Sequence, residues 1–281
     1  MIQKKQAAIT LSDTLHQFLP KDHPLSIATI NQFMRTTPDI LQASSFDHVQ
    51  SLIRHYQFSA VAFDIQTVQT NVSLIQSLQR EHIPILSYTI NDISTAQALA
   101  SHNIRIFTDN PTILHTIPNS IAHRGYHTSP KHSNTQHAFL AAAQHNIQTM
   151  EYDVRQCKDT IIIYHDPCIL DTTGAIGAPS TLYLVHELSY SQLTQINPHI
   201  LSFNKLLNLN LNTIQHNIEI KQDNSHSFPA HILRQQLQSC EKDTHTLPSI
   251  ILSSFHQSIH DQLKAAPSLP QGPIGLFQAS Q

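Results

Sequence analysis

The feature that most constrains this chain is a regular alternation of short β-branched strands with apolar-periodic helices. The strand expected at residues 60–63 leads to a helix at 72–79, and the strand at 85–90 leads to a helix at 95–101. The same alternation continues through the rest of the chain, with further helices expected at 137–145, 228–237 and 259–265. Strands that alternate with helices of this length are typical of βαβ units, in which a parallel sheet is covered by helices. We therefore predict an α/β fold.

The number of expected strands fits a closed barrel. The chain has 281 residues, and a TIM (βα)8 barrel typically takes ~250. Three candidate barrel strands precede residue 112, and five follow residue 119. They are the segments 60–63, 85–90, 104–107, 121, 150–154, 218–220, 250–252 and 274–277. We expect segment 160–164 to be a hairpin partner outside these eight, and segment 171–190 to leave the main fold.

Composition excludes several classes of protein. The net charge is −3 and lysine and arginine do not cluster, which argues against a nucleic-acid partner. Every apolar run is far shorter than the ~20 residues of a membrane span. The N-terminus lacks the apolar segment of a secretory signal, and three cysteines are too few for a disulfide framework. We therefore expect a cytoplasmic globular protein, and the sequence gives no indication of an oligomer.

Glycine is scarce, and asparagine is expected to replace it at helix ends. All five glycines lie beyond residue 120. Helices commonly end at a left-handed residue, usually glycine and sometimes asparagine. The tripeptide His-Asn-Ile occurs three times before an expected strand, and it predicts helix-ending roles for Asn103 and Asn146 and a strand-opening role for Asn217. A compositional bias toward histidine and asparagine is the alternative explanation.

Four short motifs stand at or just past the ends of expected strands. They are Ala122-His123-Arg124-Gly125, Glu151-Tyr152-Asp153-Val154, Tyr164-His165-Asp166-Pro167 and Ile218-Glu219-Ile220-Lys221. In a parallel barrel the carboxyl ends of the strands converge on one rim, where active sites lie. Side chains two residues apart on a strand leave the same face. The charged groups of these motifs are therefore expected to meet at one end of the barrel.

Three carboxylates of this set, Glu151, Asp153 and Glu219, would repel one another unless a cation lay between them. Carboxylate oxygens suit a hard divalent ion, Mg²⁺ or Ca²⁺, better than they suit zinc. The sequence therefore predicts a divalent-metal site formed by these three side chains.

The remaining polar groups favour chemistry on a phosphate ester. His123 and His165 suit acid–base work near neutral pH, and Arg124 and Lys221 add positive charge for an anionic substrate. Taken alone, each is weak evidence, because the chain has 21 histidines and an isolated Glu-x-Lys pair is usually a solvated ion pair. The ordered combination carries the prediction. The neighbouring histidines expected on the surface or in loops are His127, His132 and His137.

These motifs, in this order, resemble the glycerophosphodiester phosphodiesterase family, and the resemblance covers roughly residues 119–280. It implies a TIM barrel of the phospholipase-C-like phosphodiesterase type. It also implies metal-dependent hydrolysis of glycerophosphodiesters to sn-glycerol 3-phosphate and an alcohol. The residues implied are metal ligands Glu151, Asp153 and Glu219, acid–base groups His123 and His165, and phosphate-binding Arg124 and Lys221.

The sequence departs from the family pattern in two ways. Ser133 stands where the family usually has glutamate, which affects the support of the site. The segments 87–92 and 106–111 resemble the strands that close the family's barrel, with Tyr88 in place of tryptophan, yet they precede His123.

The chain is therefore either a circularly permuted barrel or a window cut from a tandem pair. A Gln-Ala-Ser sequence at 42–44 recurs at 278–280 and suits both readings. We favour a single barrel over residues 1–281, because an open half-barrel would leave unpaired strand edges. In that barrel, residues 41–115 supply the closing strands, residues 119–281 supply the opening strands and motifs, and residues 1–40 are extra or duplicated. A reciprocal assembly of two chains would satisfy the edges equally well.

Two other functions stay open at the level of sequence. One is a non-catalytic or weakly active remnant of a truncated or rearranged gene. The other is a related phospholipase-D-like activity on lysophospholipids or sphingolipids.

Overall fold

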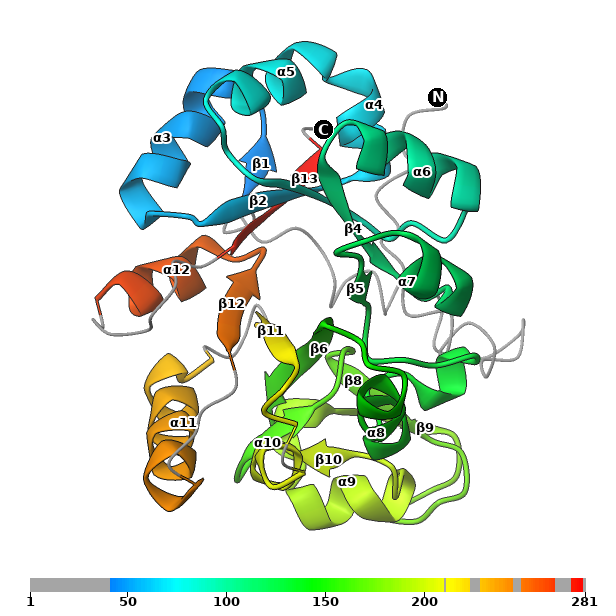
Figure 1. Ribbon diagram of the computed structural model, residues 1–281. Helices are drawn as coiled ribbons and strands as arrows, with labels where there is room; N and C mark the ends of the chain where they lie inside the picture. Colours follow the sequence, from blue (N-terminus) through cyan, green and yellow to red (C-terminus); the bar gives the residue numbers. More distant parts are fainter. Residues whose placement is uncertain (1–40, 210, 223–227, 245–248, 266–273, 280–281) are drawn as a thin grey trace, which may run out of the picture.

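The computed structural model describes residues 41–209, 211–222, 228–244, 249–265 and 274–279, so the segment 1–40 lies outside it. Within these residues, eight parallel strands form a closed barrel with helices around its outside (Figure 1). In spatial order the strands are β6 (Thr149–Gln156), β11 (Gln215–Ile220), β12 (Ile250–Ser254), β13 (Ile274–Ala279), β2 (Ala60–Asp64), β3 (Ile85–Tyr88), β4 (Ile104–Thr108) and β5 (Ile121–Ala122).

Two contacts join the two parts of the chain into one barrel. Ile274–Phe277 of β13 pairs in parallel with Ala60–Phe63 of β2, and Ala122 of β5 pairs with Met150 of β6. The predicted set of eight strands is therefore confirmed. The predicted hairpin partner is also confirmed, because β7 (Ile161–Ile163) pairs antiparallel with the extended end of β6.

Helices connect successive strands along the outside of the barrel. They are α3 (Phe46–Tyr56), α4 (Ile65–Thr70), α5 (Val72–Arg80), α6 (Ile93–Ser101), α7 (Pro111–Thr116), α8 (Gln136–Gln144), α11 (Ala230–Thr244) and α12 (Gln257–Lys264). The sequence pattern predicts five of these, at α5, α6, α8, α11 and α12. The short helices α4 and α7 depend on a capping side chain, because Asp64 accepts from Thr67 N and Asn110 accepts from Thr112 N.

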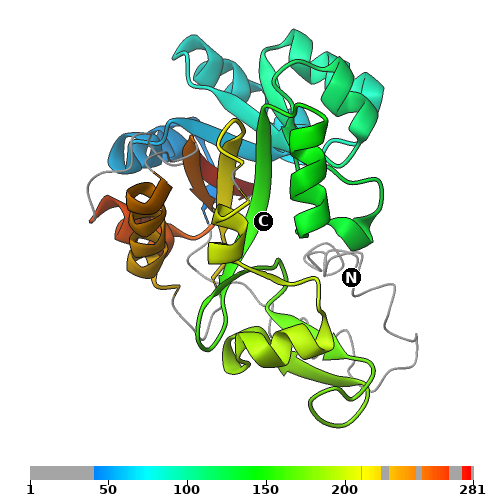
Figure 2. The same ribbon diagram turned by 60° about the horizontal axis from the view of Figure 1, so that its bottom comes forward.

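The segment after β7 leaves the barrel, as expected, but it has regular structure. Figure 2 shows this yellow-green segment projecting from the barrel. Its elements are β8 (Cys168–Asp171), β9 (Thr181–Leu184), the 3₁₀ turn η2 (Val185–Glu187), α9 (Tyr190–Ile196), β10 (Leu201–Ser202) and α10 (Phe203–Leu207), and a second 3₁₀ turn, η1 (Pro130–His132), precedes α8. The buried Asp171 carboxylate accepts the backbone N–H groups of residues 173–176, which fixes the turn between β8 and β9.

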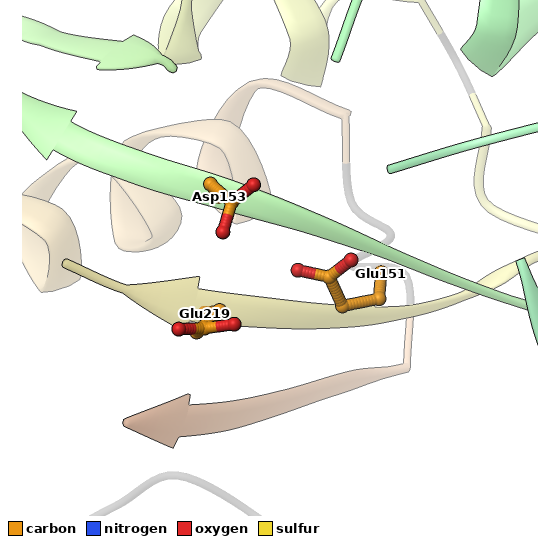
Figure 3. Close-up of side chains that lie close together, drawn as sticks. All are labelled: Glu151, Asp153 and Glu219. Carbon is orange, nitrogen blue, oxygen red and sulfur yellow. The ribbon is translucent and has the colours of Figure 1, made fainter. Parts of the chain in front are cut away.

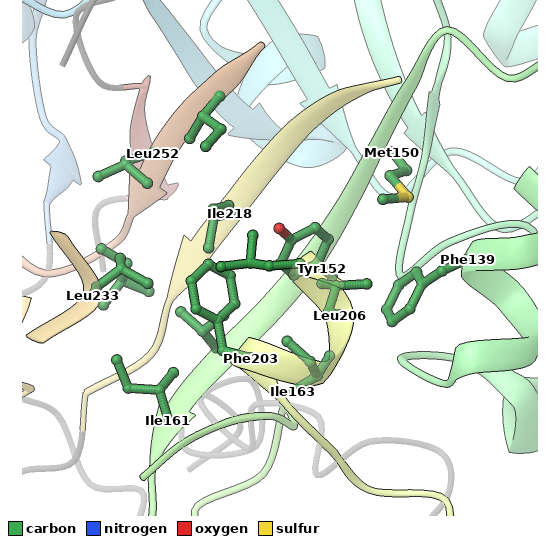
Figure 4. Close-up of a cluster of buried hydrophobic side chains, with 14 of the residues drawn as sticks. Phe139, Met150, Tyr152, Ile161, Ile163, Phe203, Leu206, Ile218, Leu233 and Leu252 are labelled. Atoms are coloured by element: carbon green, nitrogen blue, oxygen red, sulfur yellow. The ribbon is translucent and has the colours of Figure 1, made fainter. Parts of the chain in front are cut away.

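The barrel wall separates two apolar regions. On the outer face of β6 and β11, side chains such as Tyr152 and Ile218 pack against α8, α10 and α11 (Figure 4). A smaller cluster fills the barrel interior, including Leu86, Phe107 and Leu276. Because side chains alternate along a strand, the residues between the outward-facing apolar positions of β6 face the interior. This alternation directs Glu151 and Asp153 inward.

The Gln-Ala pairs of the two Gln-Ala-Ser copies lie side by side, while Ser280 lies outside the described residues. The short strand β1 (Gln42–Ala43) pairs in parallel with the end of β13, with Gln42 opposite Gln278 and Ala43 opposite Ala279. Leu41 N also donates to Phe255 O at 2.8 Å, just past the end of β12. The first copy therefore extends the sheet next to the second copy.

The asparagines predicted to end helices do so. Asn103 and Asn146 have φ angles of 57° and 55° and follow the last residues of α6 and α8. The prediction for Asn217 is wrong, because β11 begins two residues earlier at Gln215, whose N–H donates to Gln148 O.

Candidate active site

Three buried carboxylates converge inside the barrel at the carboxyl ends of β6 and β11. One oxygen from each of Glu151, Asp153 and Glu219 lies within 4.8 Å of the other two (Figure 3). The register explains the arrangement, because Glu219 pairs with Asp153 and Glu151 precedes Asp153 on the same face. The predicted carboxylate cluster is therefore present, and its oxygen donors suit a hard divalent cation.

Two basic side chains partly balance this negative charge. Lys221 Nζ contacts Glu219 Oε1 and lies 3.2 Å from Asp153 Oδ1, and Arg124 Nε lies 3.2 Å from Asp153 Oδ2. Burial alone would raise the pKa of Asp153, but the positive charge of Lys221 and other nearby groups outweighs it and lowers that pKa.

Glu151 behaves differently from Asp153. Burial, followed by the charges of Asp153 and Glu219, raises the pKa of Glu151. Burial also raises the pKa of Glu219, although Lys221 opposes the shift. The three carboxylates therefore share one site in which full ionisation is unfavourable until a further positive charge is present.

The His123 imidazole is held by a carboxylate from the neighbouring strand. Its Nδ1 lies 2.8 Å from Oδ1 of Asp109, which follows the end of β4. Its Nε2 lies 3.9 Å from Glu151 Oε2, so this second nitrogen faces the carboxylate cluster. Burial alone would raise the pKa of Asp109, but the hydrogen bonds from His123 and His127 outweigh it and lower that pKa.

The second predicted histidine has a carboxylate partner of its own. His165 Nδ1 lies 2.7 Å from Oδ1 of the adjacent Asp166, and Arg155 donates to the His165 carbonyl at 2.8 Å. Burial and the nearby charges of Arg124 and Lys221 lower the pKa of His165 to about 4. Because Asp166 holds Nδ1, Nε2 of His165 is the nitrogen left for the site.

The loop after β5 shapes the site through backbone geometry. Gly125 has φ of +85°, and a Cβ there would lie 2.9 Å from Ala138 Cβ. Glycine therefore lets the His-Arg-Gly loop pack against α8 while Arg124 N donates to Glu151 Oε2 at 2.9 Å. Asn134, next to Ser133, donates its amide to Asp153 Oδ2 at 2.7 Å. Asn134 thus supplies direct support to a carboxylate of the cluster.

His127 lies in the loop after β5, one of the two expected placements, but it is buried. Its side chain is 6% exposed, and its Nε2 lies 3.2 Å from the His123 carbonyl and 3.5 Å from Asp109 Oδ1. It is buried because the loop after β5 folds back over Asp109. His132 and His137 are exposed, as expected.

An aromatic pair borders the cluster. Tyr88 and Phe255 meet edge to face with ring centroids 5.5 Å apart, and Lys221 Nζ lies 5.7 Å from the Phe255 ring centroid. Tyr88 donates its hydroxyl to Phe277 O at 2.6 Å, which ties this ring to β13.

The structure therefore gathers all of the predicted site residues at one end of the barrel. The sequence analysis assigned no supporting role to Asp109, Asp166 or Asn134. Asp109 had a usable signal, because it directly follows a strand whose carboxyl end lies on the same rim. A surface cavity of about 510 Å³ lies elsewhere, at the amino ends of β3 and β4, and its lining from Gln79 to Asn103 contains no carboxylate. Among the described helices, none has the length and apolar character needed to cross a membrane.

Comparison with known proteins agrees with this geometry. The sequence model of the glycerophosphoryl diester phosphodiesterase family matches residues 123–265. No curated protein matches the chain.

Solved structures assigned as glycerophosphodiester phosphodiesterases also match. A protein from Galdieria sulphuraria is 23% identical, with 56% of this chain and 63% of that chain covered and a TM-score of 0.42. One from Agrobacterium tumefaciens is 21% identical, with 54% and 61% covered and a TM-score of 0.42. One from Parabacteroides distasonis is 18% identical, with 56% and 63% covered and a TM-score of 0.41. The match spans less than two thirds of each of these structures.

The family match covers half of the chain and contains the His-Arg-Gly loop, the three carboxylates and the second histidine. The chain therefore belongs to the glycerophosphoryl diester phosphodiesterase family.

Proposed function

We propose that this protein is a metal-dependent phosphodiesterase that hydrolyses glycerophosphodiesters to sn-glycerol 3-phosphate and an alcohol. The observation that carries the proposal is the cluster of three buried carboxylates beside two imidazoles, each held at Nδ1 by an aspartate. The family assignment agrees with this substrate class.

The carboxylate cluster fits a divalent cation. Glu151 Oε1 is buried and has no hydrogen-bond partner among the described residues. One carboxylate oxygen from each of Glu151, Asp153 and Glu219 lies within 4.8 Å of the other two. Hard oxygen donors and no thiol favour Mg²⁺ or Ca²⁺ as the ion. When bound, the cation would neutralise charge on a phosphoryl oxygen.

The chain's own residues supply phosphate binding and proton transfer. Arg124 and Lys221 lie beside the cluster and place two positive charges where an anionic phosphate would bind. In the reaction, an oxygen nucleophile forms a bond to phosphorus as the bond from phosphorus to the leaving alcohol breaks. One imidazole accepts the proton of the nucleophile and the other donates a proton to the leaving oxygen. His123 and His165 are the two groups, and the geometry leaves either order open.

The proposal is tested by assaying release of sn-glycerol 3-phosphate from glycerophosphocholine by purified protein with Mg²⁺ or Ca²⁺. We expect activity that a chelator abolishes and that His123→Ala lowers by on the order of 10²- to 10⁴-fold. His132→Ala is the matched control, because His132 is an exposed histidine of the loop after β5. Activity that resists the chelator, or that survives His123→Ala unchanged, would contradict the proposal.

The same assay separates the two alternatives. A non-catalytic remnant would release no product, whereas closure of the barrel favours an intact site. A phospholipase-D-like enzyme would prefer lysophosphatidylcholine to glycerophosphocholine, so both are supplied in parallel.

We also propose that the barrel strands follow a permuted order, with residues 41–115 supplying the closing strands and residues 119–281 the opening ones. The pairing of Ile274–Phe277 with Ala60–Phe63 in one chain supports a single barrel. Sedimentation of the purified chain as a monomer would support it, and a reciprocal dimer would contradict it.

A further inference from the structure

Asn217 lies inside the barrel, directly beside a carboxylate of the cluster. It pairs in register with Glu151 on the neighbouring strand β6, and it precedes Glu219 by two residues on β11. Residues in register on adjacent strands share a face, as do residues two apart on one strand. Asn217 therefore occupies the layer immediately beneath Glu219, and its side chain is neighbour to that of Glu151.

The amide of Asn217 is buried without satisfying its hydrogen bonds. Asn217 is 1% exposed, and neither Oδ1 nor Nδ2 has a partner among the described residues. The adjacent His216 is buried on the outer face with both ring nitrogens bonded, to the Tyr152 hydroxyl at 3.0 Å and Leu211 O at 3.2 Å. A buried amide without hydrogen-bond partners destabilises a fold, so stability does not explain why an asparagine stands at position 217.

The neighbouring carboxylate has a complementary unpaired atom. Glu151 Oε2 accepts from Arg124 N at 2.9 Å, whereas the buried Glu151 Oε1 has no hydrogen-bond partner among the described residues. Asn217 Nδ2 is a donor without an acceptor, and Glu151 Oε1 is an acceptor without a donor. These two atoms belong to side chains that lie side by side on the inner face, on residues paired in register.

Together these observations point to a role in the metal site. We propose that Asn217 is a positioning residue, whose amide donates to the Glu151 carboxylate through one water and fixes its orientation toward the cation. This inference rests on the proposed function. A neutral donor suits the place, because another carboxylate would add repulsion and another cation would compete with the metal.

The test measures metal affinity without substrate, by isothermal titration of the full chain with CaCl₂ and, separately, MgCl₂. Asn217→Leu keeps a similar volume and removes both hydrogen-bonding groups. We expect it to weaken cation binding by about 10- to 100-fold, the usual effect of losing a group that orients a ligand. The thermal midpoint of the metal-free protein should fall little or rise, because the variant removes an unsatisfied amide.

The matched control is Ser87→Ala. Ser87 is 0% exposed, and its hydroxyl also lacks a partner among the described residues. It pairs in register with Phe63 and Ile106, whose side chains belong to the helix-facing core, so it lies on the outer face of the wall. We expect this variant to bind the cation as the wild type does.

Each outcome decides the inference. Unchanged cation affinity in Asn217→Leu, or an equal loss in Ser87→Ala, would overturn it and leave the proposed metal site intact. If the wild type binds neither cation, the inference and the metal dependence of the proposed function fail together. Should Asn217→Leu fail to fold, Asn217→Ala, which adds no atoms, takes its place with the same expected loss of affinity.

Discussion

His123 and Asp109 meet across neighbouring strands, with Nδ1 of the imidazole 2.8 Å from Oδ1 of the carboxylate. An ionised carboxylate can only accept a hydrogen bond, so Nδ1 carries the hydrogen and Nε2 is the nitrogen that faces the carboxylate cluster. Asn91 holds the other oxygen of Asp109 through its amide at 3.0 Å. The aspartate is thus fixed on one side and fixes the imidazole on the other.

Asp109→Asn should therefore lower kcat more than it changes KM. An amide offers either an oxygen or an NH₂ group to Nδ1, so it no longer enforces one tautomer of His123. We expect kcat to fall on the order of 10²-fold in steady-state assays with glycerophosphocholine. Asp92→Asn is the control, since Asp92 is an exposed carboxylate that caps α6 at Thr95 N. Full kcat in Asp109→Asn would argue against a role for this pair.

Cation binding should release protons. Burial and the neighbouring carboxylates raise the pKa of Glu151, and burial raises that of Glu219. A bound cation requires both groups to be ionised, so affinity should decrease as pH falls through these raised pKa values. Titration calorimetry at one pH in two buffers of different ionisation enthalpy measures the protons released. A heat that does not depend on the buffer at pH 5 would contradict the expectation.

His216 should make the fold sensitive to acid. Burial lowers the pKa of His216 to about 4, against roughly 6.5 in an unfolded chain. Between these values the unfolded state binds more protons, so this contribution is fully present above about pH 6.5 and is lost as pH falls toward 4. It amounts to about 3 kcal/mol at most. Urea unfolding at pH 7.5, 6 and 5 measures it.

Two variants separate this effect from other sources of acid sensitivity. His216→Leu should flatten part of the pH dependence, and the remainder belongs partly to His165, whose pKa is also lowered to about 4. His137→Leu, at an exposed histidine, should leave the dependence unchanged. Identical pH profiles for the wild type and His216→Leu would be the contrary result.

The left-handed asparagines provide a test of helix termination. Asn103 and Asn146 have φ angles near 57° and 55°, a conformation that costs other non-glycine residues about 1 kcal/mol or more. Alanine at either position should lower the free energy of unfolding by about 1 kcal/mol, whereas glycine should change it by no more than about 0.5 kcal/mol. Chemical denaturation of the four single variants measures both effects. Equal losses for alanine and glycine would show that the side chain, not the backbone conformation, matters.

The strands and the grouping of the carboxylates could be predicted from the sequence because both depend on the order of residues within short segments. A β-branched run such as Ile104–Thr108 is readable in isolation, and the two-residue spacing of Glu151 and Asp153 fixes their shared face. Helix α7 was missed because six residues give too little periodicity, and its start depends on the Asn110 side chain. The residue pattern of one strand does not show which other strand will pair with it in the sheet.

The missed supporting groups depend on contacts between segments. Asn134 reaches Asp153 from the loop before α8, and His127 turns inward because the loop after β5 folds over Asp109. The unsatisfied amide of Asn217 becomes visible only when its neighbours across β6 and β12 are known. Such relationships arise from packing and have no sequence spacing of their own.

In the order of strands around the barrel, the strands that carry the site lie opposite the β13–β2 pairing that closes the barrel. The site draws on β4, β5, β6 and β11, which are consecutive neighbours in the ring, while the seam between β13 and β2 lies diametrically across it. That seam joins residues 274–277 to residues 60–63, the pairing between barrel strands with the greatest separation along the chain. Contacts of this kind are the slowest to form in folding. The four strands of the site can therefore pair with one another before β13 pairs with β2. Because β2 and β13 lie on the opposite side of the barrel, a permuted strand order would leave the four strands of the site next to one another.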